Sequence, residues 1–275
     1  MMNKFFFLLV FVFLNLTISQ KIYGAEQFNF DVTEVEILED GNLFKGLKRG
    51  TVTTNDGVII NADQFEYNKL LNILKANGNV EMIDSFKDYK IYSQAVTYLK
   101  NKEIIFSKGE SKALLNEIII SGDTFTYNKK ENIFNVKKNV KIIDQIEDII
   151  IFSENITYNQ NKESIFSKGK TNSIIQSKYN FKSSDVNYLR NKMELSSNNK
   201  TEIKDDNGSF YNLSKFNYQI NKKKLKGEDI VVTTNYNLPK SDKYYFKNGI
   251  FDFKNKEFFA KDTKIVLHSN LFAED

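Results

Sequence analysis

The side chains that could carry chemistry in this sequence are carboxylates that recur at fixed positions. Asp63 and Asp84 are matched, sixty residues further on, by Asp123 and Asp144. Repeated carboxylates suggest calcium binding, but the sequence does not contain the glycine-rich nonapeptide of calcium-binding β-repeats. We therefore expect these four side chains to accept hydrogen bonds at turns and strand ends.

Other reactive residue types are scarce, and this scarcity excludes several classes of site. The sequence has no cysteine, so disulfide bonds, thiolate zinc sites and cysteine nucleophiles are excluded. A single histidine, His268, cannot form a histidine metal cluster, and we expect it to lie on a strand face. Only Arg49 and Arg190 could form bidentate contacts with phosphate. We expect no enzyme activity, no catalytic residue, no metal site and no cofactor.

The charge balance gives little support to nucleic-acid binding. The 39 Lys and Arg residues against 35 Asp and Glu give a formal charge of +4. Lys4 and Lys21 lie in a segment that looks removable, so residues 26–275 carry 37 minus 35, or +2. A nucleic-acid partner requires a denser basic surface than this. Lysine-rich stretches such as Lys222–Lys224 could meet anionic lipid head groups, although solvated turns are the simpler interpretation.

The N-terminal segment has the features of a secretory signal. A basic start at residues 1–4 precedes the apolar run Phe5–Ile18, and Tyr23-Gly24-Ala25 closes the segment. The run is shorter than the about 20 apolar residues of a membrane-spanning helix. We expect residues 1–25 to be a signal peptide, with an uncleaved anchor as the alternative because Tyr23 is not small. Residues 26–275 are then one exported domain, most simply placed in a periplasm.

The sequence repeats itself at two periods. Residues 62–111 and 122–171 align without a gap at an offset of 60 residues, with 24 identities in 50 positions. A shorter period of about 30 residues is marked by an apolar residue, one polar residue and an aromatic residue. A short Asn/Lys-rich stretch and then another apolar run follow each triplet. Period-two spacing is typical of strands, and the polar stretches are typical of tight turns.

We therefore predict an all-β fold built from hairpin repeats of about 30 residues, with roughly sixteen antiparallel strands. Stacking buries the apolar face of each unit against its neighbours, so the domain should be elongated. The alternative is a parallel β-helix, whose coils are usually shorter. The segment Asn235–Asp242, which contains the only proline, is the best candidate for an irregular loop.

One repeated phrase resembles a known family. Residues 62–68, ADQFEYN, continuing to residues 76–80, ANGNV, are similar to the OstA-like repeat of the lipopolysaccharide-transport proteins LptA, LptC and the N-terminal domain of LptD. A weaker copy occupies residues 122–142. The resemblance implies a twisted antiparallel β-jellyroll, open along one side, whose apolar groove carries the acyl chains of lipid A. It also implies partners of the same fold, docked edge to edge into a bridge across the periplasm.

Within this family, residues 242–275 resemble the end of the periplasmic part of LptD. In LptD-like chains that part leads toward an outer-membrane barrel, which is not contained in this sequence, and the cysteines of many LptD proteins are also missing. We expect either a fragment of an LptD-type protein or a stand-alone LptA-like bridge, and we favour the fragment. In either case we expect a periplasmic domain that is associated with the outer membrane.

The repeated triplets supply the candidate groove residues. A tyrosine in most units is suggestive, because its hydroxyl group needs water or a partner, as at the rim of a groove. The alternative is that these side chains fill a closed core and touch no ligand. Two other functions remain open: a structural or adhesive surface β-repeat protein and, with less support, a β-helical polysaccharide-active enzyme. The candidate lipid-groove residues are Phe65, Tyr67, Val96, Tyr98, Phe125, Tyr127, Ile156, Tyr158, Val186, Tyr188, Phe216 and Tyr218.

Overall fold

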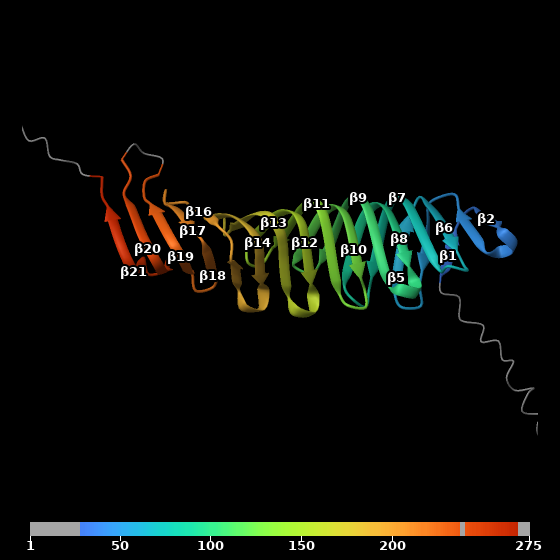
Figure 1. Cartoon of the computed structure of the whole chain (residues 1–275). Helices are drawn as coiled ribbons and strands as arrows, with labels where there is room; N and C mark the ends of the chain where they lie inside the picture. The colour runs from blue at the N-terminus through green and yellow to red at the C-terminus, as the bar shows by residue number, and fades with distance from the viewer. Residues whose placement is uncertain (1–27, 237–239, 269–275) are drawn as a thin grey trace, which may run out of the picture.

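The computed structural model describes residues 28–236 and 240–268, which form one elongated sheet of 21 strands (Figure 1). Every strand pair is antiparallel, so the all-β prediction is confirmed and the parallel β-helix alternative is wrong. The expected signal peptide lies outside the described residues. Within the described residues, no helix is both long enough and apolar enough to cross a membrane.

The strands follow one another along the molecule almost in chain order, from the blue end to the red end of Figure 1. The first half contains β1 (Asn29–Val32), β2 (Val35–Leu38), β3 (Leu43–Gly46), β4 (Gly50–Thr53), β5 (Val58–Ala62), β6 (Gln64–Asn68), β7 (Ile73–Asp84), β8 (Tyr89–Leu99), β9 (Ile104–Leu115), β10 (Ile118–Asn128) and β11 (Ile133–Asp144). The second half contains β12 (Ile149–Asn159), β13 (Ser164–Ile175), β14 (Tyr179–Leu189), β15 (Glu194–Ser197), β16 (Thr201–Asp205), β17 (Phe210–Leu213), β18 (Lys215–Gln219), β19 (Lys224–Thr233), β20 (Lys243–Asp252) and β21 (Glu257–Val266).

The strand count agrees with the sequence once broken strands are joined. Five pairs of consecutive short strands each occupy the place of one long strand in the sheet: β1/β2, β3/β4, β5/β6, β15/β16 and β17/β18. We call each long strand, and each such pair, a rung. Counting each pair once gives 21 minus 5, or sixteen rungs, which is the number predicted. The middle of the molecule, β7 to β14, has unbroken rungs of 11 or 12 residues, two in each repeat.

Each long strand from β7 to β14 is interrupted near its middle by a β-bulge, where the sheet bends. In β7 the pairing with β8 shifts between Asn77 and Val80, and the same shift recurs between Lys137 and Val140 of β11. Gly78 occupies the bulge of β7 with φ +77, and a Cβ atom there would lie 2.5 Å from the Asp63 carboxylate. Bulges of this kind bend and twist a strand. The bend divides the sheet into a first wall, which carries the aromatic triplets, and a second wall.

The polar stretches after the triplets form turns, as predicted. Three of them are single 3₁₀ turns, Lys100–Lys102, Gln160–Lys162 and Arg190–Lys192. The residue with positive φ is asparagine only in some units: Asn72 and Asn132 adopt it, but Glu103, Glu163 and Met193 do so after the 3₁₀ turns. The backbone geometry is therefore set by the hairpin, and asparagine is one of several residues that tolerate it.

The repeated carboxylates bond locally, as expected. Asp63 accepts a hydrogen bond from Asn79 Nδ2 at 2.7 Å across the bulge, and Asn139 contacts Asp123 in the same way. Asp84 Oδ1 accepts bonds from the next turn, and Asp144 repeats this arrangement. No group of three His, Cys, Asp or Glu side chains in the described residues could hold a metal ion.

Two smaller expectations concern the C-terminal end. His268 lies beyond β21, which ends at Val266, so the prediction of a strand-face histidine is wrong. Its backbone N–H donates to Asp242 Oδ1 at 2.8 Å. The expected loop at 235–242 does separate β19 from β20, although residues 237–239 are outside the described part.

Candidate functional site: the apolar interior and its seam

The interior between the two walls holds a continuous cluster of apolar side chains along the sheet. All twelve candidate groove residues lie in it, and their exposed fractions range from 0% to 8%. They belong to one buried cluster that extends from Phe28 to Phe251. The structure thus brings the candidates together on one face. It shows their side chains covered by one another and by the second wall.

The tyrosines form a row that runs across the strands near the edge of the first wall. On the paired strands, each tyrosine alternates with an aliphatic residue or phenylalanine: Leu74 pairs with Tyr67 and Tyr98, and Phe134 pairs with Tyr127 and Tyr158. The alternation follows from the repeat, because only every second rung carries the triplet. The ring of Tyr127 stacks on Phe134 with centroids 3.9 Å apart.

The hydroxyl ends of these tyrosines point away from the bend. They point to the opposite edge, where the turns at the end of one wall touch the turns at the end of the other. We call the turns that end the first wall the first lip, those that end the second wall the second lip, and the line between them the seam. Tyr127 OH donates to Asn132 Oδ1 in a first-lip turn at 3.2 Å. Tyr188 OH donates to Asp144 Oδ2 of the second lip at 2.9 Å. Burial, with the nearby Asp144 carboxylate, raises the pKa of Tyr188 well above its ordinary value, so it stays a neutral donor.

Ion pairs join the lips at two places along the seam. At the first, Lys100 Nζ lies 2.6 Å from Asp56 Oδ1, and Lys129 Nζ lies 3.0 Å from Asp56 Oδ2 and 2.9 Å from Asp84 Oδ2. At the second, Arg190 Nε lies 2.7 Å from Asp144 Oδ2. The cations come from the first lip and the carboxylates from the second. These pairs therefore hold the interior closed.

One seam ion pair, Lys129 with Asp84, is almost completely shielded from solvent. Lys129 is 3% exposed and Asp84 is 1% exposed. Burial acts to raise the pKa of Asp56, but hydrogen bonds from Lys100, Thr54 and Lys129 outweigh it and hold that pKa well below the ordinary carboxyl range. Burial acts to lower the pKa of Arg190, and the contact with Asp144 reverses this, so the guanidinium remains charged.

Sequence reasoning identified Asp84 and Asp144 but not their partners across the seam. Lys129 lies in an Asn/Lys-rich stretch that was interpreted as a solvated turn, and the structure shows that its side chain is buried. The available signal was the position two residues after the triplet tyrosine, which holds a cation in several units: Lys69, Lys100, Lys129 and Arg190.

Sequence reasoning also missed a row of hydroxyl side chains inside the bend. Ser93, Ser111 and Ser107 are hydrogen-bonded to one another at 3.1 and 2.9 Å. Ser93 Oγ also donates to the carbonyl of Lys108 at 2.9 Å. A bulge interrupts the backbone ladder, and these hydroxyls satisfy carbonyl groups that are released there. Related positions in later rungs are Ser153, Ser167, Thr171, Ser183, Ser197 and Thr201.

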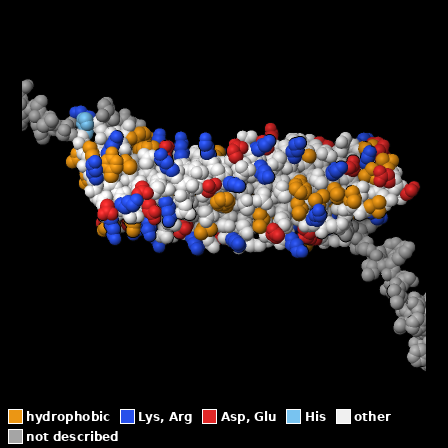
Figure 2. All heavy atoms as spheres, viewed as in Figure 1, with side chains coloured by type: hydrophobic (Ala, Val, Ile, Leu, Met, Phe, Trp, Pro, Cys, Tyr) orange, Lys and Arg blue, Asp and Glu red, His pale blue; other side chains and the backbone are white. Residues whose placement is uncertain are grey.

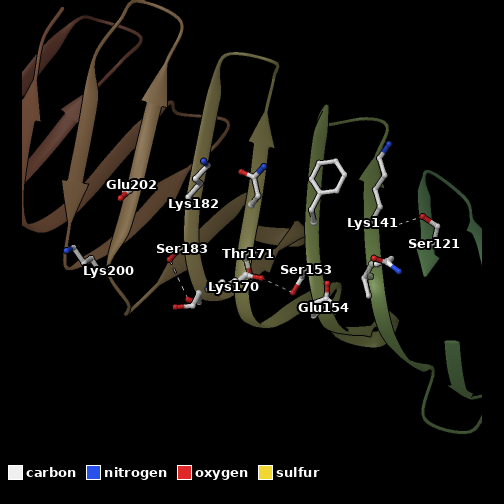
Figure 3. A pocket seen from close by; sticks show the side chains of 15 residues that line it. Ser121, Lys141, Ser153, Glu154, Lys170, Thr171, Lys182, Ser183, Lys200 and Glu202 are labelled. Atoms are coloured by element: carbon white, nitrogen blue, oxygen red, sulfur yellow. Dashed lines mark hydrogen bonds between the residues drawn. The ribbon is translucent and has the colours of Figure 1, made fainter. Parts of the chain in front are cut away.

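The surface of the described residues has several hollows. One, about 1160 Å³, is an open depression on the outside of the bend across β11 to β14 and β16, and Lys141, Lys170, Lys182 and Lys200 are among its lining residues (Figure 3). A second, about 380 Å³, lies by Phe30 and Phe44 near the N-terminal end. A third, about 360 Å³, lies on the seam near the C-terminal end, between Tyr211 and Phe253.

Both ends of the sheet leave apolar side chains exposed. At the C-terminal end, β21 pairs with β20 and with no other strand of the described residues, and Phe259 and Ile265 are 67% and 52% exposed. At the N-terminal end Ile37 of β2 is 61% exposed. Hydrophobic side chains gather at these two ends in Figure 2, with charged side chains along the sides between them. Such edges carry unpaired backbone groups that another strand can complete.

The fold and the interior define a long, bent antiparallel sheet with an apolar inner face, a charged seam and open ends. No family model matches the chain, and no curated protein sequence matches it. Among solved structures, the chain is similar to LptH from Pseudomonas aeruginosa, described as the LptA-homologous periplasmic component of the lipopolysaccharide transport device. The match has 10% identity and a TM-score of 0.39, and it covers 42% of this chain and 93% of LptH.

Proposed function

We propose that this chain is a non-enzymatic, periplasmic lipid conduit that binds the acyl chains of lipopolysaccharide between its two walls. The observation that supports this is the continuous apolar inner face, on which successive rungs place aromatic and aliphatic residues in one row. Each buried methylene group of a lipid gains about 0.8 kcal/mol, so a multi-acyl lipid favours such a face over water. The OstA-like phrase beginning at Ala62 points to the same class of ligand.

We also propose that the open ends bind other β-jellyroll proteins by strand addition. The edge of β21 offers unpaired backbone groups together with exposed apolar side chains. Pairing there would extend the inner face from one protein into the next, toward the outer membrane. We favour an origin in the periplasmic part of an LptD-type protein, with a stand-alone LptA-like bridge as the alternative.

The test is retention of lipid by the purified chain. We expect lipopolysaccharide to co-purify with it, and Phe125→Glu, which places a charge on the inner face, to abolish retention. Thr126→Glu, at the outward-facing neighbour, is the matched control and should retain the lipid. Circular dichroism establishes that both variants are folded. If the folded protein never retains or crosslinks an acyl lipid, the proposal is wrong, and the second candidate, a structural or adhesive repeat protein with a permanently closed core, takes its place.

A further inference from the structure

The chemistry of the first lip changes along the molecule. Along the ion-paired part of the seam, the position two residues after the inward aromatic holds Lys100, Lys129, Gln160 and Arg190, and the three cations among them form the seam ion pairs. After Tyr218 and Phe251 the same position holds Ile220 and Phe253 instead. Ile220 is fully buried. In its C-terminal third the seam therefore has apolar side chains where most earlier units have cations.

Aromatic contacts replace the ion pairs there. Phe253, from the first lip, stacks on Tyr179 of the second lip with centroids 5.1 Å apart and planes 22° apart. The ring of Phe253 also makes an edge-to-face contact with the ring of Tyr211, from the second lip, and their centroids are 5.8 Å apart. These rings are the contact between the walls at this point, and their packing does not depend on a buried charge.

The seam hollow of about 360 Å³ lies beside these rings. Its apolar lining includes Tyr179, Tyr211, Phe251, Phe253 and Phe258. Phe251 is 7% exposed and belongs to the buried interior cluster, so the hollow borders the interior.

The carboxylates at the rim of this hollow are occupied locally. Asp205 accepts bonds from the backbone of Asn207 and Ser209 at 3.0 and 2.7 Å. Asp252 accepts bonds from the backbone of Lys254 and is paired with Lys224 at 3.1 Å. Neither carboxylate forms a seam ion pair like that of Asp144 among the described residues.

A buried hydroxyl group, that of Tyr218, lies close to the rings of Phe253 and Tyr179. The hydroxyl of Tyr218 has no hydrogen-bond partner among the described residues, whereas Tyr127 and Tyr188, in the same row, both have one. Its ring lies 6.2 Å from Phe253 and 5.8 Å from Tyr179. A buried donor without a partner is costly, and an ester or amide carbonyl on an incoming chain would satisfy it.

We propose that the seam opens at Phe253 and admits an acyl chain sideways into the interior, with the chain's carbonyl group bonded to Tyr218. This inference rests on the proposed function and adds the place where the lipid enters. Separating Phe253 from Tyr179 breaks a ring-on-ring contact and uncovers ring surface, which the acyl chain covers again. Separating Lys129 from Asp84 would instead leave two buried charges unpaired. The ion-paired part of the seam therefore stays closed while the C-terminal third opens.

The first experiment locates the chain on the seam. A photo-crosslinking benzoylphenylalanine replaces Phe253 in one variant and Gln160 in another; Gln160 occupies the same repeat position after Tyr158. A fluorescent lauric-acid analogue and lipopolysaccharide micelles are the two probes, so that free fatty acid and lipopolysaccharide can be told apart as sources of the chain. We expect labelling at least tenfold stronger at position 253. Equal or stronger labelling at 160 overturns the proposed opening but leaves lipid binding intact, and no binding of either probe by the folded chain overturns the proposed function as well.

The second experiment restores the cation of the earlier repeats. Phe253→Lys places an ammonium group opposite Asp205, and we expect lipid uptake in stopped-flow fluorescence to slow at least fivefold with the final occupancy unchanged. Asn221→Lys, in an exposed position of the preceding first-lip turn, adds the same charge as a control and should not change the rate. Tyr218→Phe should weaken binding of the lauric-acid analogue several-fold and leave dodecane binding unchanged. An unchanged uptake rate in a folded Phe253→Lys protein overturns the proposal.

Discussion

Lys129 Nζ lies 2.9 Å from Asp84 Oδ2, and this contact joins two turns from opposite walls, 45 residues apart in the chain. Lys129 Nζ also lies 3.0 Å from Asp56 Oδ2. One buried ammonium group therefore connects two turns of the second lip to one turn of the first lip. The neighbouring Lys87 adds a hydrogen bond from its ammonium group to the carbonyl of Lys129. This group of side chains is the tightest closure of the seam in the N-terminal half.

Removing the cation should destabilise the protein strongly. Lys129→Met leaves Asp84 buried without its partner, and we expect the free energy of unfolding to fall by about 3–5 kcal/mol. Urea denaturation followed by circular dichroism measures this change. Lys130→Met, at the exposed neighbouring position, is the control and should stay within about 0.5 kcal/mol of the parent. Recovery of most of the loss in the double variant Lys129→Met/Asp84→Leu would show that the loss came from the unpaired carboxylate.

The seam should weaken in acid. The pKa of Asp56 is below its ordinary value of 3.8 in the folded state, so the folded protein releases this proton more readily than the unfolded chain does. The stability that Asp56 contributes is therefore complete above that ordinary value and is lost as the pH falls below it. We expect the stability difference between the parent and Asp56→Asn to shrink as the pH is lowered from about 7 to about 3. Asp206→Asn, in another turn of the second lip, controls for the loss of a charge, and a difference that grows in acid would contradict the prediction.

The bulge of β7 should depend on glycine more than the bulge of β13 does. Gly78 and Gly169 have φ values of +77 and +83, but an added Cβ would meet Asp63 at 2.5 Å only at Gly78. Nothing lies within 4 Å at Gly169. Gly169→Ala should cost about 1 kcal/mol from backbone strain, and Gly78→Ala should cost about 1–2 kcal/mol more. Thermal denaturation of the two variants measures the difference, and equal losses would refute the steric argument.

The C-terminal edge should mediate association between molecules. Phe259→Lys places a charge on the exposed face of β21, and we expect it to reduce end-to-end association at least tenfold in sedimentation velocity experiments. Phe106→Lys is the matched control, because Phe106 is also an exposed phenylalanine but lies on β9 in the middle of the sheet. Association that is insensitive to Phe259→Lys and sensitive to Phe106→Lys would place the contact on a sheet face.

Much of this architecture could be predicted from local sequence patterns. The triplets Phe65-x-Tyr67 and Phe125-x-Tyr127 have strand spacing and are followed by turn residues, and both features act over a few residues. The antiparallel pairing and the sixteen rungs follow from them. The shared burial of the aromatic residues follows too, because a repeat places equivalent side chains on one face.

The seam could not be predicted in the same way. Lys129 and Asp84 are brought together by the bend of the sheet, which depends on bulges at residues such as Gly78 and on the contact between whole walls. A polar stretch with a buried lysine looks the same in sequence as one with a solvated lysine. The hydroxyl row at Ser93 and Ser111 was missed for a similar reason, because its role exists only where a bulge interrupts the ladder.

The stacking of rungs has a consequence for molecular length. In the backbone ladder, each rung pairs only with the rung before it and the rung after it, so a rung pair can be duplicated or deleted without disturbing the ladder of distant rungs. Adjacent strands are about 4.8 Å apart, so sixteen rungs span roughly 75 Å, and each duplicated hairpin would add about 10 Å. The segments at 62–111 and 122–171, which share 24 of 50 residues at an offset of 60, are an internal repeat with a period of two hairpins. Gene duplication can therefore change the length of the molecule in steps of one hairpin.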